Sequence, residues 1–289
     1  MRRHRYTRPM SPLRDCSVAT VGSGVIAEAM IAGLLRGQQV EPHKVVASHP
    51  RADRREQLAR DYGIRTVASN VEAVAGADII VLAVKPQMVV KVGRELAGAL
   101  NDGQLVISVV AGATTTALTS VLEHPQVVRS MPNTPSRLGR GVTVWYATPE
   151  VTADQREQAS ALLRTLGAEL SVEDEKMVAM ATAVSGTGPT YVFLVMEALV
   201  DAAVHLGFPR HIAHDLVIET IEGSALFAKS SGMHPAELRN MVTSPGGTSA
   251  AALYQLESGR LRTVLSDAVW AAYRRTEELG EQLEKNAAR

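Results

Sequence analysis

Two segments of the sequence combine glycine with small and polar residues in patterns that can bind negatively charged groups. The first is GSGVIA at residues 22–27, which follows an apolar run, and the second is TSPGGTS at residues 243–249. Each is followed by a helical pattern, and the first N–H groups of a helix have no partner within it. The first segment therefore predicts a phosphate-binding loop, and the second predicts a carboxylate site.

The first segment has the spacing of a dinucleotide-binding loop. Gly22, Gly24 and Ala27 form a G-x-G-x-x-A pattern between a predicted strand and a predicted helix. The first glycine allows a tight turn, the second lets the backbone approach a pyrophosphate, and a small third residue lets the helix pack close to the sheet. A plain strand-to-helix turn is the alternative, but the strand–helix–strand context favours a dinucleotide.

The end of the second predicted strand indicates which dinucleotide is bound. An NAD-preferring site usually carries an acidic residue there for the ribose hydroxyl. This chain has Ser48, His49 and Arg51 instead, and the first acidic residue is Asp53. A hydroxyl and a guanidinium suit a 2′-phosphate, although the arginines here could also form only a solvated helix start. We expect NADP(H) to be preferred, with NAD(H) as the alternative.

Two further strand ends would lie near the cofactor, because ligands of open α/β sheets bind beyond the carboxyl ends of the strands. The third predicted strand ends in AVKPQ at 83–87, where Lys85 has a structural or a cofactor-binding role and Pro86 fixes the loop. The fourth ends in SVVAGA at 108–113, where Gly112 would permit close approach to a ring.

The second anion-binding segment reads as a turn that opens a helix. Residues 245–247 form the turn, and Thr248 begins the helix. Free amides at this helix start, with the hydroxyls of Ser244, Thr248 and Ser249, would bind a carboxylate. Thr248 or Ser249 could also serve as the N-cap of the helix, and the two roles are compatible.

Short β-branched runs alternate with helical segments over the first part of the chain. The candidate strands are 16–21, 44–48, 77–84, 104–110, 126–131, 142–147 and 168–172. Several are nearly continuous apolar runs, which suits strands that are covered on both faces. Predicted helices at 25–36 and 52–62 each end at a glycine. This order predicts a doubly wound α/β domain of the Rossmann type.

The strand pattern stops near residue 174, and only helices are expected beyond it. They are 189–206, 210–231, 247–257 and 261–287, and their broad apolar faces must be covered. We divide the chain into a basic disordered tail (1–14), an NADP-binding domain (15–174) and an all-α dimerisation and substrate domain (175–289). A second subunit could cover part of the apolar faces, so we expect a homodimer through the last domain.

Composition argues against several other functions. Lys+Arg and Asp+Glu number 30 each, so no global charge favours nucleic acid. A single cysteine, Cys16, cannot form an internal disulfide, which fits a cytoplasmic protein, and no His, Cys and acid spacing indicates a metal site. The most apolar run, Tyr191–Val200, contains Glu197 and is too short to span a membrane.

The basic tail lacks the apolar segment of a signal peptide. We expect it to be disordered, and Met10 could equally begin the chain.

Taken in order, six segments resemble those of pyrroline-5-carboxylate reductases over almost the whole chain after the tail. They are GSGVIA at 22–27, AVKPQ at 83–87, SVVAGA at 108–113, RSMPNTP at 129–135, AVSGTGPTYVFLVMEALVDAAVHLGFPR at 183–210 and TSPGGTSAAALYQLESGRLR at 243–262. The last segment is the most specific. Thr187 replaces a common Ser, Ser249 replaces a common Thr, and Val25 replaces an Asn or Asp-like residue, so two of the three departures keep a hydroxyl.

The resemblance implies reduction of Δ1-pyrroline-5-carboxylate to L-proline, the final step of proline biosynthesis, by NADPH or NADH. It also implies a helical dimerisation domain and an active site shared between subunits, and decamers of five dimers occur in the family. By its place in the motif, Ser249 would hydrogen-bond the ring nitrogen. Asn133 would orient the nicotinamide amide or only shape a loop, and Thr187 would line the pocket or belong to a hinge.

These patterns and the resemblance together give the expected site residues. Catalysis is expected of Ser249 and Thr248, and substrate binding of Ser244, Gly246, Gly247 and Thr187. Cofactor binding is expected of Gly22, Ser23, Gly24, Val25, Ile26, Ala27, Ser48, Arg51, Asn70, Ala83, Val84, Lys85, Pro86, Ala111, Gly112 and Asn133. No metal is expected.

Two other functions compete with this hypothesis. A β-hydroxyacid dehydrogenase shares the order of domains, but Val192 stands where that group has its catalytic lysine. A regulator that senses NADP(H) without turnover would keep the glycine loop but would not need a hydroxyl-rich TSPGGTS segment.

Overall fold

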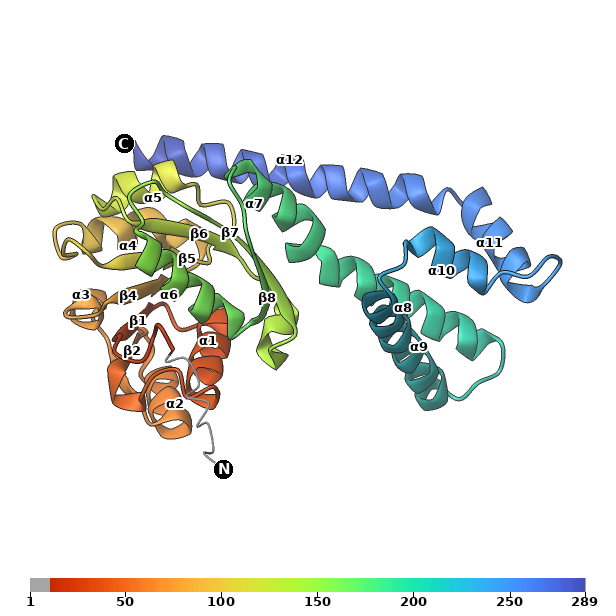
Figure 1. The fold of residues 1–289 in the computed structure, drawn as a ribbon, viewed down its shortest axis with the longest axis horizontal. Helices are drawn as coiled ribbons and strands as arrows, with labels where there is room; N and C mark the ends of the chain where they lie inside the picture. The colour runs from red at the N-terminus through yellow and green to blue at the C-terminus, as the bar shows by residue number, and fades with distance from the viewer. Residues whose placement is uncertain (1–10, 289) are drawn as a thin grey trace, which may run out of the picture. The chain divides into compact units, whose positions relative to one another are not determined.

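The computed structural model describes residues 11–288 of the chain, which form two compact units. One unit contains the described chain up to Thr187 together with the residues from Ala272 onward, and the other is Gly188–Ala271. The first unit is a sheet covered by helices, and the second is entirely helical (Figure 1).

Eight strands form one sheet in the order β3-β2-β1-β4-β5-β6-β7-β8. Neighbouring strands from β3 to β6 pair in parallel, β7 runs antiparallel to β6, and β8 is parallel to β7. The strands are β1 Val18–Val21, β2 Val45–Ser48, β3 Arg65–Val67, β4 Ile79–Leu82, β5 Leu105–Ser108, β6 Val127–Met131, β7 Gly141–Ala147 and β8 Gly167–Ser171. All predicted strands are present and the doubly wound α/β fold is confirmed, but β3 was not predicted.

Helices cover both faces of this sheet, as its apolar strands require. One face packs against α1 (Val25–Arg36), α2 (Ala52–Tyr62) and α6 (Ala153–Arg164). The other packs against α3 (Asn70–Val74), α4 (Val89–Leu96), α5 (Thr115–Leu122) and Leu283 of α12 (Leu261–Ala287). Short 3₁₀ turns, η1 (Pro42–Lys44), η2 (Pro86–Met88) and η3 (Thr134–Leu138), lie in the connections.

The first compact unit extends past the boundary at 174 that the sequence suggests. Helix α7 (Lys176–Ala181) and the π-helix η4 (Thr182–Gly186) follow the last strand, and α7 packs on β6 and β7. The last part of α12 also belongs to this unit. The change from strands to helices at 174 is therefore a change of secondary structure inside one packed unit.

The second unit contains the helices expected from the sequence and one more. They are α8 (Gly188–His205), α9 (Arg210–Ser231), α10 (Pro235–Met241), α11 (Thr248–Ser258) and the first part of α12. Helix α10 is the additional one. It begins with a capping box between His234 and Glu237, a local signal for a helix start.

The predicted tail lies mostly outside the described residues, and so does Met10. Residues 12–15 form a turn, and Leu13 is fully buried in the core beside α1 and β1. The packed domain therefore begins before residue 15.

One helical stretch meets the length and composition expected of a membrane span. It is Lys176–His205, whose best window has a mean hydropathy of 1.3 and is 22% buried. The expectation that no run is long enough is wrong by this criterion, because the helix continues on both sides of the Tyr191–Val200 run and two charges are tolerated. The same composition is typical of a helix that packs against another protein chain.

Candidate functional site

The turn after β1 leaves no room for a side chain at Gly22. Its φ is +80°, a conformation that favours glycine. A Cβ atom there would lie 2.8 Å from Val84 Cγ1 and 2.9 Å from the carbonyl oxygen of Ala83. The first glycine of the pattern is therefore required by the packing of β1 against the end of β4.

The second glycine of the loop faces open space. Gly24 is the N-cap of α1, no side chain caps this helix start, and a Cβ atom on Gly24 would meet no atom within 4 Å. Ala27 is fully buried, Ile26 packs on the core, and Val25 is exposed. The first amides of α1 lack helical partners, so this open, uncapped start fits a dinucleotide pyrophosphate.

Two serines expected to contact the cofactor form hydrogen bonds inside the protein. The Ser23 hydroxyl lies 3.0 Å from Thr20 Oγ1 and donates to the Ser48 carbonyl at 3.1 Å. The Ser48 hydroxyl is fully buried and donates to Asn70 Oδ1 at 2.7 Å. These bonds hold the ends of β1 and β2 and the start of α3 together, and a contact of Ser48 with a 2′-phosphate stays a prediction.

Arg51 lies at the start of α2 with an exposed guanidinium. Its Nε donates to Asp53 Oδ1 at 3.1 Å, and this hydrogen bond lowers the pKa of the Asp53 carboxyl. The Arg51 amide donates to His49 Nδ1 at 3.2 Å. Burial lowers the pKa of the His49 imidazole.

The two neighbouring arginines hold the local backbone. Arg54 bonds Glu28 Oε2 at 2.6 Å and the Ser23 carbonyl at 3.2 Å, while Arg55 donates to the His49 carbonyl at 2.8 Å. Arg54 and Arg55 therefore have structural roles. Arg51 is the remaining arginine at the start of α2 and is suited to bind a cofactor phosphate.

The loop after β4 and the loop after β5 carry other expected residues. Ala83 and Val84 enclose Gly22, Lys85 is exposed, and Pro86 begins η2. Ala111 is half-buried and precedes Gly112, which has a φ of +75°. A Cβ on Gly112 would lie 3.0 Å from Leu279 Cβ, so this glycine accommodates α12, and its approach to a cofactor ring stays a prediction.

Asn133 and Thr187 make bonds that shape their own segments. Asn133 Oδ1 accepts a hydrogen bond from the Val142 amide at 3.0 Å, which fixes the connection between β6 and β7. The Thr187 amide and hydroxyl both donate to the Thr182 carbonyl, at 2.8 Å and 2.9 Å, which closes the π-helix. Such π-helical turns are frequent at functional sites.

The carboxylate segment lies in the second unit and begins α11. Gly246 has a φ of +70°, and Gly247 is the N-cap of α11, with no side chain capping the helix start. The expectation that Thr248 or Ser249 caps the helix is therefore wrong, because both lie inside its first turn. Ser244 and Thr248 are exposed and Ser249 is half-buried. The uncapped amides and hydroxyls suit a small carboxylate.

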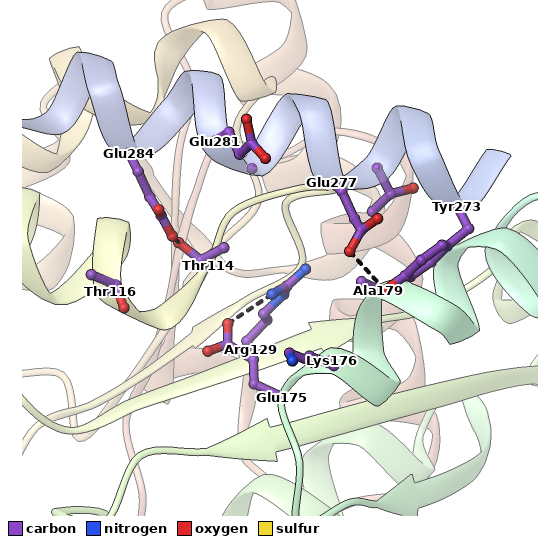
Figure 2. Close-up of a pocket in the computed structure, with 12 residues that line it drawn as sticks. Thr114, Thr116, Arg129, Glu175, Lys176, Ala179, Tyr273, Glu277, Glu281 and Glu284 are labelled. Carbon is purple, nitrogen blue, oxygen red and sulfur yellow. Dashed lines mark hydrogen bonds and ion pairs between the residues drawn. The ribbon is translucent and has the colours of Figure 1, made fainter. Parts of the chain in front are cut away.

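A charged cavity between β6, α5, α7 and α12 was not predicted from the sequence. Its volume is about 230 Å³, and Arg129 on β6 and Glu175 at the start of α7 lie in its wall, opposite Glu277, Glu281 and Glu284 of α12 (Figure 2). Arg129 Nη1 lies 2.7 Å from Glu175 Oε1. An arginine inside an otherwise apolar strand pattern was the signal that could have indicated it.

Within residues 11–288, no group of three or more His, Cys, Asp and Glu residues could hold a metal ion.

Two protein-family models match the chain, and together they span most of it. Residues 175–279 match a model described as pyrroline-5-carboxylate reductase dimerisation. Residues 17–112 match one described as NADP oxidoreductase coenzyme F420-dependent.

Curated proteins are similar to this chain over nearly its full length. It is 43% identical over 267 residues to a pyrroline-5-carboxylate reductase of Pseudomonas aeruginosa, which covers 92% of this chain and 97% of that protein. It is 39% identical over 262 residues to the enzyme of the same name from Synechocystis, with 91% and 97% covered.

Solved structures show the same similarity. A pyrroline-5-carboxylate reductase of Coxiella burnetii has a TM-score of 0.85 and 35% identity, covering 91% of this chain and 98% of that one. A pyrroline carboxylate reductase of Plasmodium falciparum with NADP bound has a TM-score of 0.84 and 28% identity, covering 93% and 99%.

The two loop glycines should respond differently to alanine. Gly24→Ala should fold as stably as the natural chain but bind NADPH at least about tenfold more weakly, because the methyl group enters the space of the pyrophosphate. Gly22→Ala should lower the free energy of unfolding by about 1–3 kcal/mol, because it clashes and has an unfavourable φ. Urea unfolding and NADPH fluorescence titration measure these effects. Equal NADPH affinity of Gly24→Ala and the natural chain would contradict the loop assignment.

Proposed function

The chain belongs to the pyrroline-5-carboxylate reductase family, and we propose that it reduces Δ1-pyrroline-5-carboxylate to L-proline through the two anion-binding segments described above. The observation that carries this proposal is that both segments begin a helix at a glycine without a side-chain cap. One suits a dinucleotide phosphate and the other a small carboxylate, which are the two anions that this reaction brings together.

The first unit supplies the cofactor half-site. The amides at the start of α1 would hold the pyrophosphate over Gly24, and Arg51 would bind the 2′-phosphate that distinguishes NADPH from NADH. Lys85 is exposed beyond the end of β4, on the edge where ligands of such sheets bind. Bound NADPH supplies the hydride that reduces the imine carbon.

The second unit supplies the substrate half-site. The first amides of α11 and the Ser244 and Thr248 hydroxyls would hold the substrate carboxylate, because an uncapped helix start favours an anion. Ser249 would accept a hydrogen bond from the protonated ring nitrogen. This bond stabilises the iminium form, which is the better hydride acceptor. Positioning is therefore the main work of the protein, and no strong general acid or base is needed.

The assembly is proposed to be a homodimer formed through the helical unit. Helix α8 exposes Val192, Phe193, Leu194, Val195 and Leu199, and α9, α11 and α12 expose further large apolar side chains. Apolar surface of this extent marks a protein interface. The match to a dimerisation model over residues 175–279 supports this proposal, and a decamer of five such dimers is the larger assembly that we propose.

The enzyme is further proposed to act in the cytoplasm, without a nucleic-acid or membrane partner. Equal numbers of acidic and basic residues give no charge that would favour nucleic acid, and an interface role for α8 accounts for its apolar surface without a membrane. A single free cysteine, Cys16, suits the reducing cytoplasm.

Removing two of the three hydroxyls of the substrate half-site should abolish most of the activity. The variant Thr248→Ala/Ser249→Ala should lower kcat/KM for pyrroline-5-carboxylate by about 100-fold or more, because two hydrogen bonds to charged groups are lost. Oxidation of NADPH is followed by its absorbance, and NADPH affinity by fluorescence. The control Ser258→Ala changes the last residue of the same helix and should be as active as the natural chain.

Rapid turnover by the double variant would refute the assignment of these residues. Tight NADPH binding by the natural chain without any turnover of pyrroline-5-carboxylate would instead favour an NADP(H)-sensing regulator.

Arg51 should set the preference between the two cofactors. Arg51→Ala should raise KM for NADPH by about tenfold and leave KM for NADH unchanged, because only NADPH carries the 2′-phosphate. The matched control is Arg60→Ala, which removes another exposed guanidinium from the same helix. Equal effects of Arg51→Ala on both cofactors would show that Arg51 does not read the phosphate.

A charge on the exposed face of α8 should prevent dimer formation. The variant Leu194→Glu changes a leucine that is 64% exposed. The mass of this variant protein, measured by light scattering, should fall to that of one chain. The control is Leu138→Glu, in which a 76% exposed leucine of the first unit is changed and the assembly should persist. An unchanged mass for Leu194→Glu would place the interface elsewhere.

A further inference from the structure

Arg129 is a charged residue on an interior strand of the sheet. It lies on β6, opposite Ser108 of β5 and Tyr146 of β7, and is only 5% exposed. Residues before and after it on β6 are buried as well. A buried guanidinium needs a partner, because desolvation of an unpaired charge is strongly unfavourable.

The partner, Glu175, bonds to more than Arg129. Its Oε1 lies 2.7 Å from Arg129 Nη1 and accepts from the Thr115 amide at 2.7 Å, while its Oε2 accepts from the Thr115 hydroxyl at 2.6 Å. Thr115 is the first residue of α5, and Glu175 is the N-cap of α7. One carboxylate therefore ties together β6, the start of α5 and the start of α7. Figure 2 shows its ion pair with Arg129.

Each of these three elements leads to a residue that the sequence predicts at the cofactor or substrate site. Strand β6 ends two residues before Asn133, α5 begins three residues after Gly112, and α7 continues through the π-helix to Thr187. The end of β6 and the π-helix after α7 also meet directly, because a Cβ on Gly186 would lie 2.8 Å from Met131 Cε. The ion pair is thus the common support of three segments that carry predicted site residues.

Packing alone does not account for this ion pair. Apolar residues of similar volume often replace a buried ion pair with no loss of stability. An ion pair with fixed bond directions, in contrast, specifies one arrangement of the elements that it joins. The three glutamates of α12 in the cavity wall have other partners: Glu277 bonds Tyr273, Glu284 bonds Thr114 and Glu281 pairs with Lys285. Among the described residues, the ion pair of Arg129 is with Glu175.

We infer that Arg129 and Glu175 are positioning residues for hydride transfer, which hold the segments of Gly112, Asn133 and Thr187 in the arrangement that the reaction needs. This inference rests on the proposed function. The two residues act through the backbone that they join and do not touch the substrate. Because small displacements of reacting groups lower rates strongly, removal of the pair lowers kcat even where the protein folds well.

The test separates positioning from stability by removing both charges together. Glu175→Gln alone leaves Arg129 unpaired and should lower the unfolding temperature. Arg129→Met/Glu175→Met should recover most of that loss, because no buried charge remains. Its kcat should nevertheless stay about 100-fold below that of the natural chain, with KM for NADPH within about threefold. Arg129→Lys, which keeps a charge near Glu175, should recover part of kcat.

A second readout does not depend on turnover. The fluorescence lifetime of bound NADPH reports the surroundings of its nicotinamide, so it should fall toward that of free NADPH in Arg129→Met/Glu175→Met while the Kd stays within about threefold. The control is Arg164→Met, which removes an ion pair with Glu169 between α6 and β8 in the same unit and should leave kcat and lifetime unchanged.

A stable Arg129→Met/Glu175→Met variant with the kcat or the NADPH lifetime of the natural chain would overturn the inference and leave the pair a structural role only. Absence of turnover by the natural chain would instead refute the proposed function. In that case the NADPH lifetime still decides whether the pair positions the nicotinamide.

Discussion

The parallel pairing of β1 with β4 is the constraint on which the first unit depends. The Ala83 amide donates to the Val21 carbonyl at 2.8 Å. The ends of β1 and β4 are therefore so close that Gly22, the residue after Val21, has no room for a side chain. Only a glycine with a positive φ can make the turn at Gly22. The helix that follows then starts at the sheet edge, where β2, β4, β5 and β6 also end. The cofactor half-site is thus a consequence of how the sheet is built.

A second close contact brings the last part of α12 against the loop after β5, on the face of the sheet that α3, α4 and α5 cover. Gly112 has a positive φ and lies against Leu279, and a Cβ on Gly280 would lie 3.3 Å from the Gly112 carbonyl oxygen. These two glycines let α12 approach the loop after β5. Next to this contact, the cavity of Figure 2 separates the α12 glutamates from Arg129. A hydrogen bond to Glu277 raises the pKa of the Tyr273 hydroxyl. The close contact between α12 and the loop after β5 therefore lies next to a charged cavity.

The sequence predicted the parts of this structure that depend on local chemistry. Apolar runs identified the buried strands, and glycines marked the ends of α1 and α2. It missed β3, because three residues at a sheet edge carry no apolar pattern. The contact between Gly112 and Leu279 joins residues far apart in the chain, and the burial of the Ser48 hydroxyl depends on Asn70. Such partners are set by the fold, and spacing along the chain does not reveal them.

The apolar helical stretch Lys176–His205 shows why composition alone is ambiguous. A membrane span and a helix at a subunit interface both need long apolar runs, and Lys176–His205 meets the length and hydropathy of either. The charges on α8 separate the two cases. Asp201 near its C-terminal end forms an exposed ion pair with Arg210 of α9 at 3.0 Å. Lipid would desolvate such a pair, whereas the rim of a protein interface leaves it in water. The match of residues 175–279 to a dimerisation model adds support for a second protein chain as the partner of these apolar side chains.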